Sequence, residues 1–114
     1  MEKKNVILEK SFVFALEIID YCEKLEGDKK YVIAKQLLRS GTSIGANIRE
    51  AQNSESRADF IHKLKISAKE ASETEYWLLL CQKSNTYPKN DRLILMLQEI
   101  QKLLSSIISS SKKG

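Results

Sequence analysis

Carboxylates and a histidine are the side chains in this sequence that could perform acid–base or metal chemistry. Glu70 and Glu73 lie three residues apart, and Glu50 lies in the segment before them. A di-metal site in a helical bundle needs two Glu-x-x-His pairs on facing helices, together with further carboxylates. His62 is the single histidine of the sequence, and no glutamate stands three residues before it. A di-metal enzyme is therefore a weak alternative, and we expect neither a metal nor another cofactor.

Neither a nucleophile nor a phosphate-binding loop is indicated. Cys22 and Cys81 form no CxxC motif, and both fall on apolar stripes, so we expect buried, unreactive thiols. Gly41 and Gly45 have loop-like spacing, but no Lys-Ser or Lys-Thr pair follows them and no strand is predicted before them. We find no catalytic constellation and predict that the protein is not an enzyme.

A polar cluster is predicted where two helical segments face each other. Spacings of three and four residues place its members on one face of each segment: Ser43, Asn47, Glu50, Glu70, Glu73 and Thr74. Unpaired buried polar groups cost about 1 to 3 kcal/mol each, so hydrogen bonds across the pair would fix its register. Arg39 or Lys69 could neutralise a carboxylate there. We interpret the cluster as structural, with a ligand or partner site as the alternative.

Basic residues gather around the break between the same two segments. The net charge of the chain is +4, and five basic residues lie near this break: Arg49, Arg57, Lys63, Lys65 and Lys69. Such a group can neutralise phosphates. The charge per chain is modest, so we expect it to act when multiplied by oligomerisation. An ordinary solvated face is the alternative for any single residue.

Sparse helix breakers divide the chain into the elements that must position these residues. The sequence has one proline and four glycines, with turn signals at 27–28, 53–56 and 84–88. We predict helices at about 5–26, 29–53, 57–84 and 89–110. Because the connections are short, an all-α, antiparallel up-down-up-down four-helix bundle follows, as a single domain over residues 1–114.

Local signals mark the helix ends and one irregularity. Asp28 and Ser56 are predicted to cap the second and third helices, and Pro88 suits the start of the fourth. Gly41 and Gly45 lower helix propensity by up to about 1 kcal/mol each relative to Ala, which predicts a kink in the second helix. In the third helix, small inward residues such as Ser67 and Ala71 predict close packing against the second.

The first and fourth helices carry more apolar surface than one core needs. We place one stripe of the first helix in the core: Leu8, Phe12, Ala15, Ile19 and Cys22. The excess, rotated about 100° away, is predicted to form an oligomer interface: Ile7, Phe14, Ile18, Leu25, Leu97, Leu104 and Ile108. Large exposed apolar patches are unusual on monomers, so we expect a homo-oligomer. A merely wide core face is the alternative.

Three blocks of sequence carry a family resemblance: QLLRSGTSIGANIREA (36–51), SRADFIHKL (56–64) and KEA-x-ETEYWL (69–78). The chain resembles the bacterial four-helix-bundle family that includes proteins encoded by intervening sequences in large-subunit rRNA genes. The resemblance spans roughly residues 5–110 and implies a bundle that associates into a ring, a pentamer. Many members have Pro where this chain has Gly45.

A related branch of this family serves diversity-generating retroelements as an accessory protein. In that branch, a basic pentamer binds the reverse transcriptase and nucleic acid. The resemblance thereby adds Arg39 to Arg49, Arg57, Lys63, Lys65 and Lys69 as candidates for contact with RNA or a partner. It implies no catalytic residue.

These observations together predict a non-enzymatic oligomer that binds structured RNA or an RNA-handling protein, such as a reverse transcriptase. A protein-interaction module without nucleic-acid affinity is the alternative. The two cysteines suggest no disulfide framework, which fits the reducing cytoplasm. No segment approaches the roughly 20 apolar residues of a membrane span, so no membrane association is expected.

Overall fold

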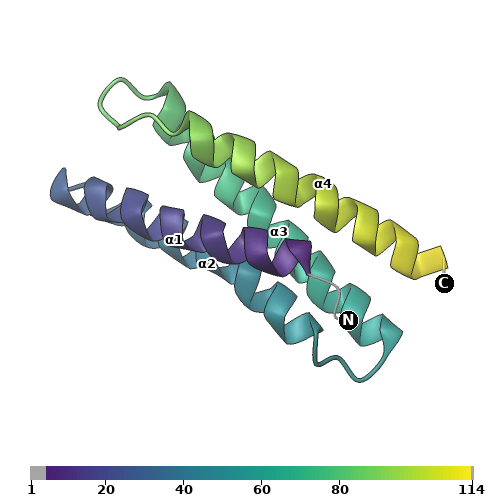
Figure 1. Cartoon of the computed structure of the whole chain (residues 1–114). Helices are drawn as coiled ribbons and strands as arrows, with labels where there is room; N and C mark the ends of the chain where they lie inside the picture. Colours follow the sequence, from purple (N-terminus) through teal and green to yellow (C-terminus); the bar gives the residue numbers. More distant parts are fainter. Residues whose placement is uncertain (1–4, 114) are drawn as a thin grey trace.

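The computed structural model describes residues 5–113, which form a bundle of four helices (Figure 1). The helices are α1 (Val6–Gly27), α2 (Tyr31–Ala51), α3 (Arg57–Lys83) and α4 (Asp91–Lys113). Each predicted helix end lies within three residues of the observed one. Consecutive helices run in opposite directions, and α1 begins beside the end of α2, where Asn5 Nδ2 donates a hydrogen bond to Gln52 Oε1.

The helices pack as a ring of four in which each helix lies beside two others. α2 lies between α1 and α3, and α4 lies between α3 and α1. The contact between α2 and α3 is the most extensive, as the small residues of α3 predicted. Ser67, Ala71 and Thr74 are buried in it. The faces that carry the predicted polar cluster therefore do meet.

Two of the predicted helix starts need correction. Ser56 caps α3 as predicted, since its side chain accepts a hydrogen bond from the backbone N–H of Asp59. Asp28 instead lies at the end of α1, and α2 begins after Lys30, whose side chain forms no capping bond. The chain reverses direction between α1 and α2 at Lys29, whose φ is 64°. Pro88 precedes the first residue of α4 by three positions.

The inward apolar stripe of α1 packs closely against a glycine of α2. Ile18 is fully buried against Gly41 of α2, and a Cβ added at Gly41 would lie only 2.9 Å from Ile18 Cγ2. A larger residue at position 41 would push α1 outward. The two glycines do not end α2, which is helical from Tyr31 to Ala51. The kink stays a prediction.

The predicted assignment of apolar faces is wrong for α1 and α4, the first and fourth helices. Six residues assigned to an oligomer interface lie in the monomer core: Ile7, Phe14, Ile18, Leu25, Leu97 and Leu104. Ile108 is partly buried against the same core. Phe12 and Ile19, which were predicted to be inside, are exposed. Both stripes are apolar, so local sequence does not distinguish them, and contact with the neighbouring helices decides which one is buried.

Candidate functional site

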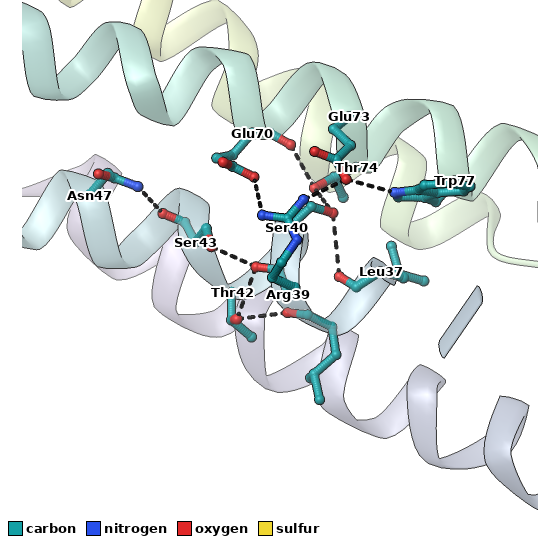
Figure 2. A network of polar contacts seen from close by, with 11 residues as sticks. Leu37, Arg39, Ser40, Thr42, Ser43, Asn47, Glu70, Glu73, Thr74 and Trp77 are labelled. Atoms are coloured by element: carbon teal, nitrogen blue, oxygen red, sulfur yellow. Dashed lines mark hydrogen bonds and ion pairs between the residues drawn. The ribbon is translucent and has the colours of Figure 1, made fainter. Parts of the chain in front are cut away.

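Half of the predicted polar cluster joins the two helices, around Arg39 and Ser40 (Figure 2): Glu70, Glu73 and Thr74 of α3 form hydrogen bonds to α2. Arg39 projects from α2 and holds two carboxylates of α3: its Nη1 lies 3.2 Å from Glu70 Oε1 and its Nη2 2.5 Å from Glu73 Oε2. Trp77 Nε1 also donates to Glu73 Oε2, at 3.1 Å. The hydrogen bonds from Arg39 and then from Trp77 hold the pKa of Glu73 below its ordinary value.

Beneath this ion pair, hydroxyl groups join the two helices inside the core. Thr74 Oγ1 lies 2.9 Å from Ser40 Oγ and 2.8 Å from the carbonyl oxygen of Glu70. Ser67 Oγ donates to the carbonyl oxygen of Ile44, also at 2.8 Å. The sequence analysis did not include Ser40 in the cluster, although its position between Leu37 and Ile44 places it on the buried stripe of α2.

The other predicted members do not bridge the helices. Ser43 Oγ donates to the carbonyl oxygen of Arg39, and Asn47 Nδ2 donates to that of Ser43, so both bonds stay within α2 (Figure 2). The side chains of Glu50 and Lys69 are exposed and form no hydrogen bond or ion pair between residues 5 and 113. Arg39 thus forms the ion pairs with the carboxylates, and the charge of Lys69 adds a smaller effect that also lowers the pKa of Glu73. The cluster links α2 to α3 in the way that a structural network does.

The two cysteine thiols and the acidic groups offer little for catalysis. Cys22 and Cys81 are buried, as predicted. Burial raises the pKa of Cys22 to about 12 and also raises the pKa of Cys81, which opposes formation of the reactive thiolate. Across residues 5–113, no group of three or more His, Cys, Asp or Glu side chains is arranged to hold a metal ion.

The six predicted basic residues do not form one patch. Arg39 is paired with acids, and Lys63 Nζ lies 3.8 Å from Asp59 Oδ1 on its own helix. Arg49 lies on the other side of the bundle, where α2 meets α1. Lys69 is exposed on α3.

Arg57 and Lys65 face α4 instead. Arg57 lines a surface hollow with Phe60 of α3 and with Ser110 and Ser111 of α4. Lys65 lies further along the same helix pair. The structure thus assigns two of the six predicted cations to the boundary between α3 and α4.

A groove between α3 and α4 brings Lys65 close to a second cation. We call it the α3–α4 groove, and its lining residues are Lys65, Ala68, Ser72, Gln101, Leu104, Ser105, Ile108, Ser109 and Lys112. Contact with Lys112 and repulsion between the two charges lower the pKa of Lys65. The sequence analysis ended the fourth helix at residue 110, so it did not include Lys112.

The sequence model of the family described as "23S rRNA-intervening sequence protein" matches residues 3–106. The chain belongs to this family.

A solved structure supports the same assignment. It is that of a protein of unknown function from the S23 ribosomal protein family of Bacteroides thetaiotaomicron. The two share 48% sequence identity with a TM-score of 0.85, over 90% of this chain and 97% of the other. A comparison with curated proteins found no match.

One exposed apolar face of this 23S rRNA-intervening sequence family member lies on α1. Phe12, Leu16 and Ile19 are 62%, 49% and 38% exposed, and their spacing of four and three residues makes one continuous stripe. We call these three residues the apolar stripe. Phe12 shares a surface hollow with Gly45 and Arg49, so the stripe is turned towards α2. No helix in the described part of the chain could span a membrane.

Proposed function

We propose that this protein is a non-enzymatic, cytoplasmic homo-oligomer, a pentamer, that binds structured RNA or an RNA-handling protein through repeated basic side chains. The observation that carries the proposal is that four of the six predicted cations, Arg49, Arg57, Lys65 and Lys69, form no ion pair within residues 5–113. Their charge is available to an external anion. One chain offers few such groups, and an oligomer multiplies them so that weak contacts add.

The apolar stripe supports the oligomeric part of the proposal. An aromatic and two aliphatic side chains exposed on one helix face are typical of a protein–protein contact. We propose the apolar stripe as the oligomer interface in place of the residues first predicted for it, because those are buried in the monomer core. A second copy of the chain is the simplest partner for it.

Sedimentation equilibrium tests the assembly directly. The wild-type protein should sediment as a complex several-fold heavier than 13.0 kDa. Replacing the exposed Phe12 and Leu16 with Lys should yield a folded monomer, because neither side chain is buried in the bundle. Lys in place of the exposed Leu95 on α4 is the matched control and should leave the assembly intact. A wild-type monomer at micromolar concentration would refute the oligomer.

Salt-dependent binding tests the RNA part. Affinity for a structured RNA should fall linearly on a plot of log K against log salt concentration, as counterion release requires. The R57E/K65E/K69E variant should lose binding. Reversing the charge of Lys63, which is paired with Asp59, should have a smaller effect. No RNA binding even at low salt would favour the second candidate, a protein-interaction module, for which the apolar stripe is the supporting observation.

A further inference from the structure

Lys65 and Lys112 come from different helices and both line the α3–α4 groove, close enough for Lys112 to lower the pKa of Lys65. Two like charges in contact repel each other. Elsewhere in this bundle, cations that approach acids across helices form ion pairs with them: Lys10 with Glu99, Arg39 with Glu70 and Glu73, and Arg92 with Glu17. No acidic residue lines the α3–α4 groove, and neither lysine has an ion pair within the part of the chain that the structure describes.

The rest of the lining suits an anion. Ser72, Ser105 and Ser109 contribute hydroxyl groups, and Gln101 contributes an amide. Hydroxyl and amide N–H groups donate hydrogen bonds to phosphate oxygens, and lysine binds phosphate as a point charge. The apolar part of the lining is Ala68, Leu104 and Ile108. Because these side chains exclude water, they favour direct contact between an anion and the two ammonium groups.

We propose that Lys65 and Lys112 together bind one phosphate group in the α3–α4 groove, and that this phosphate belongs to a single-stranded segment of RNA. The identity of the ligand rests on the proposed function, whereas the phosphate site rests on the groove itself. The neighbouring hollow favours RNA as the source, because it combines the half-buried ring of Phe60 with the guanidinium of Arg57. Aromatic rings beside a cationic track are the elements with which proteins bind unpaired bases.

The number of phosphates bound can be counted from the salt dependence. For single strands, each neutralised phosphate contributes about −0.7 to the slope of log K against log salt. The K65Q/K112Q variant should therefore lose about 0.7 of the slope, because its two lysines hold the same phosphate. The single variants K65Q and K112Q should each show most of this loss. A loss of about 1.4 in the double variant would mean two separate phosphates and would overturn the proposal.

A matched control separates a local contact from the loss of net charge. Lys35 and Lys102 are exposed on α2 and α4 and lie outside the α3–α4 groove, so K35Q/K102Q removes the same charge. The control variant should bind a fluorescent oligouridylate with the wild-type slope. All four lysines are exposed, so circular dichroism should show the same fold for every variant. Equal binding by K65Q/K112Q and K35Q/K102Q would place the phosphate contact elsewhere and refute the site.

Pyrophosphate as a probe separates failure of the site from failure of the proposed function. In nuclear magnetic resonance, pyrophosphate should shift the side-chain signals of Lys65 and Lys112 but not those of Lys35 and Lys102. If the oligouridylate does not bind while pyrophosphate gives these shifts, the phosphate site stands and RNA is wrong as its ligand. If RNA binds and the groove lysines respond to neither ligand, the proposed function stands and the site is wrong.

Discussion

The buried hydrogen bond between Ser40 and Thr74 allows a quantitative test of whether the polar cluster is structural. Both side chains are fully buried between α2 and α3, and their hydroxyl oxygens lie 2.9 Å apart. Replacing Thr74 with Val keeps the shape of the side chain but removes the hydroxyl group. Ser40 Oγ then keeps only a long contact, 3.5 Å, with the carbonyl oxygen of Leu37.

The expected cost follows from what each substitution leaves unpaired. Thr74→Val should lower the free energy of unfolding by about 1 to 3 kcal/mol, because the buried hydroxyl of Ser40 loses its good partner. Ser40→Ala should cost less, about 1 kcal/mol, since Thr74 keeps its 2.8 Å bond to the carbonyl oxygen of Glu70. The double variant removes both hydroxyls of the pair. It should be more stable than the sum of the single losses predicts, by about 1 kcal/mol.

Urea denaturation of the four proteins, followed by circular dichroism, measures these differences as a double-mutant cycle. All four should be compared at one protein concentration, because self-association would add to the apparent stability. If the losses are strictly additive, the two hydroxyls do not interact, and the structural interpretation of the cluster fails. If the variants keep their stability but lose an RNA or protein ligand, the cluster is a binding site.

Two further predictions concern packing and thiol chemistry. Gly41→Ala should lower the melting temperature relative to Gly27→Ala: the new Cβ would lie 2.9 Å from Ile18 Cγ2, whereas nothing lies within 4 Å at Gly27. Overpacking costs about 1 to 3 kcal/mol against about 1 kcal/mol of gained helix propensity, so a more stable Gly41→Ala variant would contradict the packing. Cys22 and Cys81 should react with a thiol reagent at pH 8 far more slowly in the folded protein than in denaturant. Because the pKa of Cys22 is raised from 9.0 to about 12, the stability linked to its proton is present below pH 9 and lost as the pH rises towards 12. Equal reaction rates in the two states would show that the thiols are accessible.

The local part of the fold could be predicted from the sequence, because it depends on signals within a few residues. The breaks between helices, the Ser56 cap and the inward small residues of α3 are of this kind. The polar cluster was located by helical spacing, which shows which residues share one face of a helix. Spacing does not show that Ser43 and Asn47 bond to carbonyl groups of their own helix, a local alternative open to short polar side chains.

The remaining features depend on contacts between residues far apart in the chain. α1 and α4 each have two apolar stripes, and the neighbouring helices bury one of them: Ile18 packs against Gly41 of α2, whereas Phe12 is exposed. The pairing of Lys65 with Lys112 has the same origin. The two residues are 47 positions apart, and the antiparallel return of α4 brings them together (Figure 1).

The arrangement of the bundle makes the two proposed surfaces compatible. The apolar stripe is exposed on the side of α1 that is turned towards α2, whereas the α3–α4 groove lies between the other two helices. Self-association through the stripe would therefore leave one α3–α4 groove free on every subunit. Linked sites bind a multivalent RNA more tightly than separate ones, without any new contact. Replacing Phe12 and Leu16 with Ser removes the apolar contact without adding positive charge, which would itself strengthen RNA binding. This monomer should bind a long RNA more weakly than wild type, yet bind a short oligouridylate equally well. Equal affinity for the long RNA would mean that assembly contributes nothing to binding.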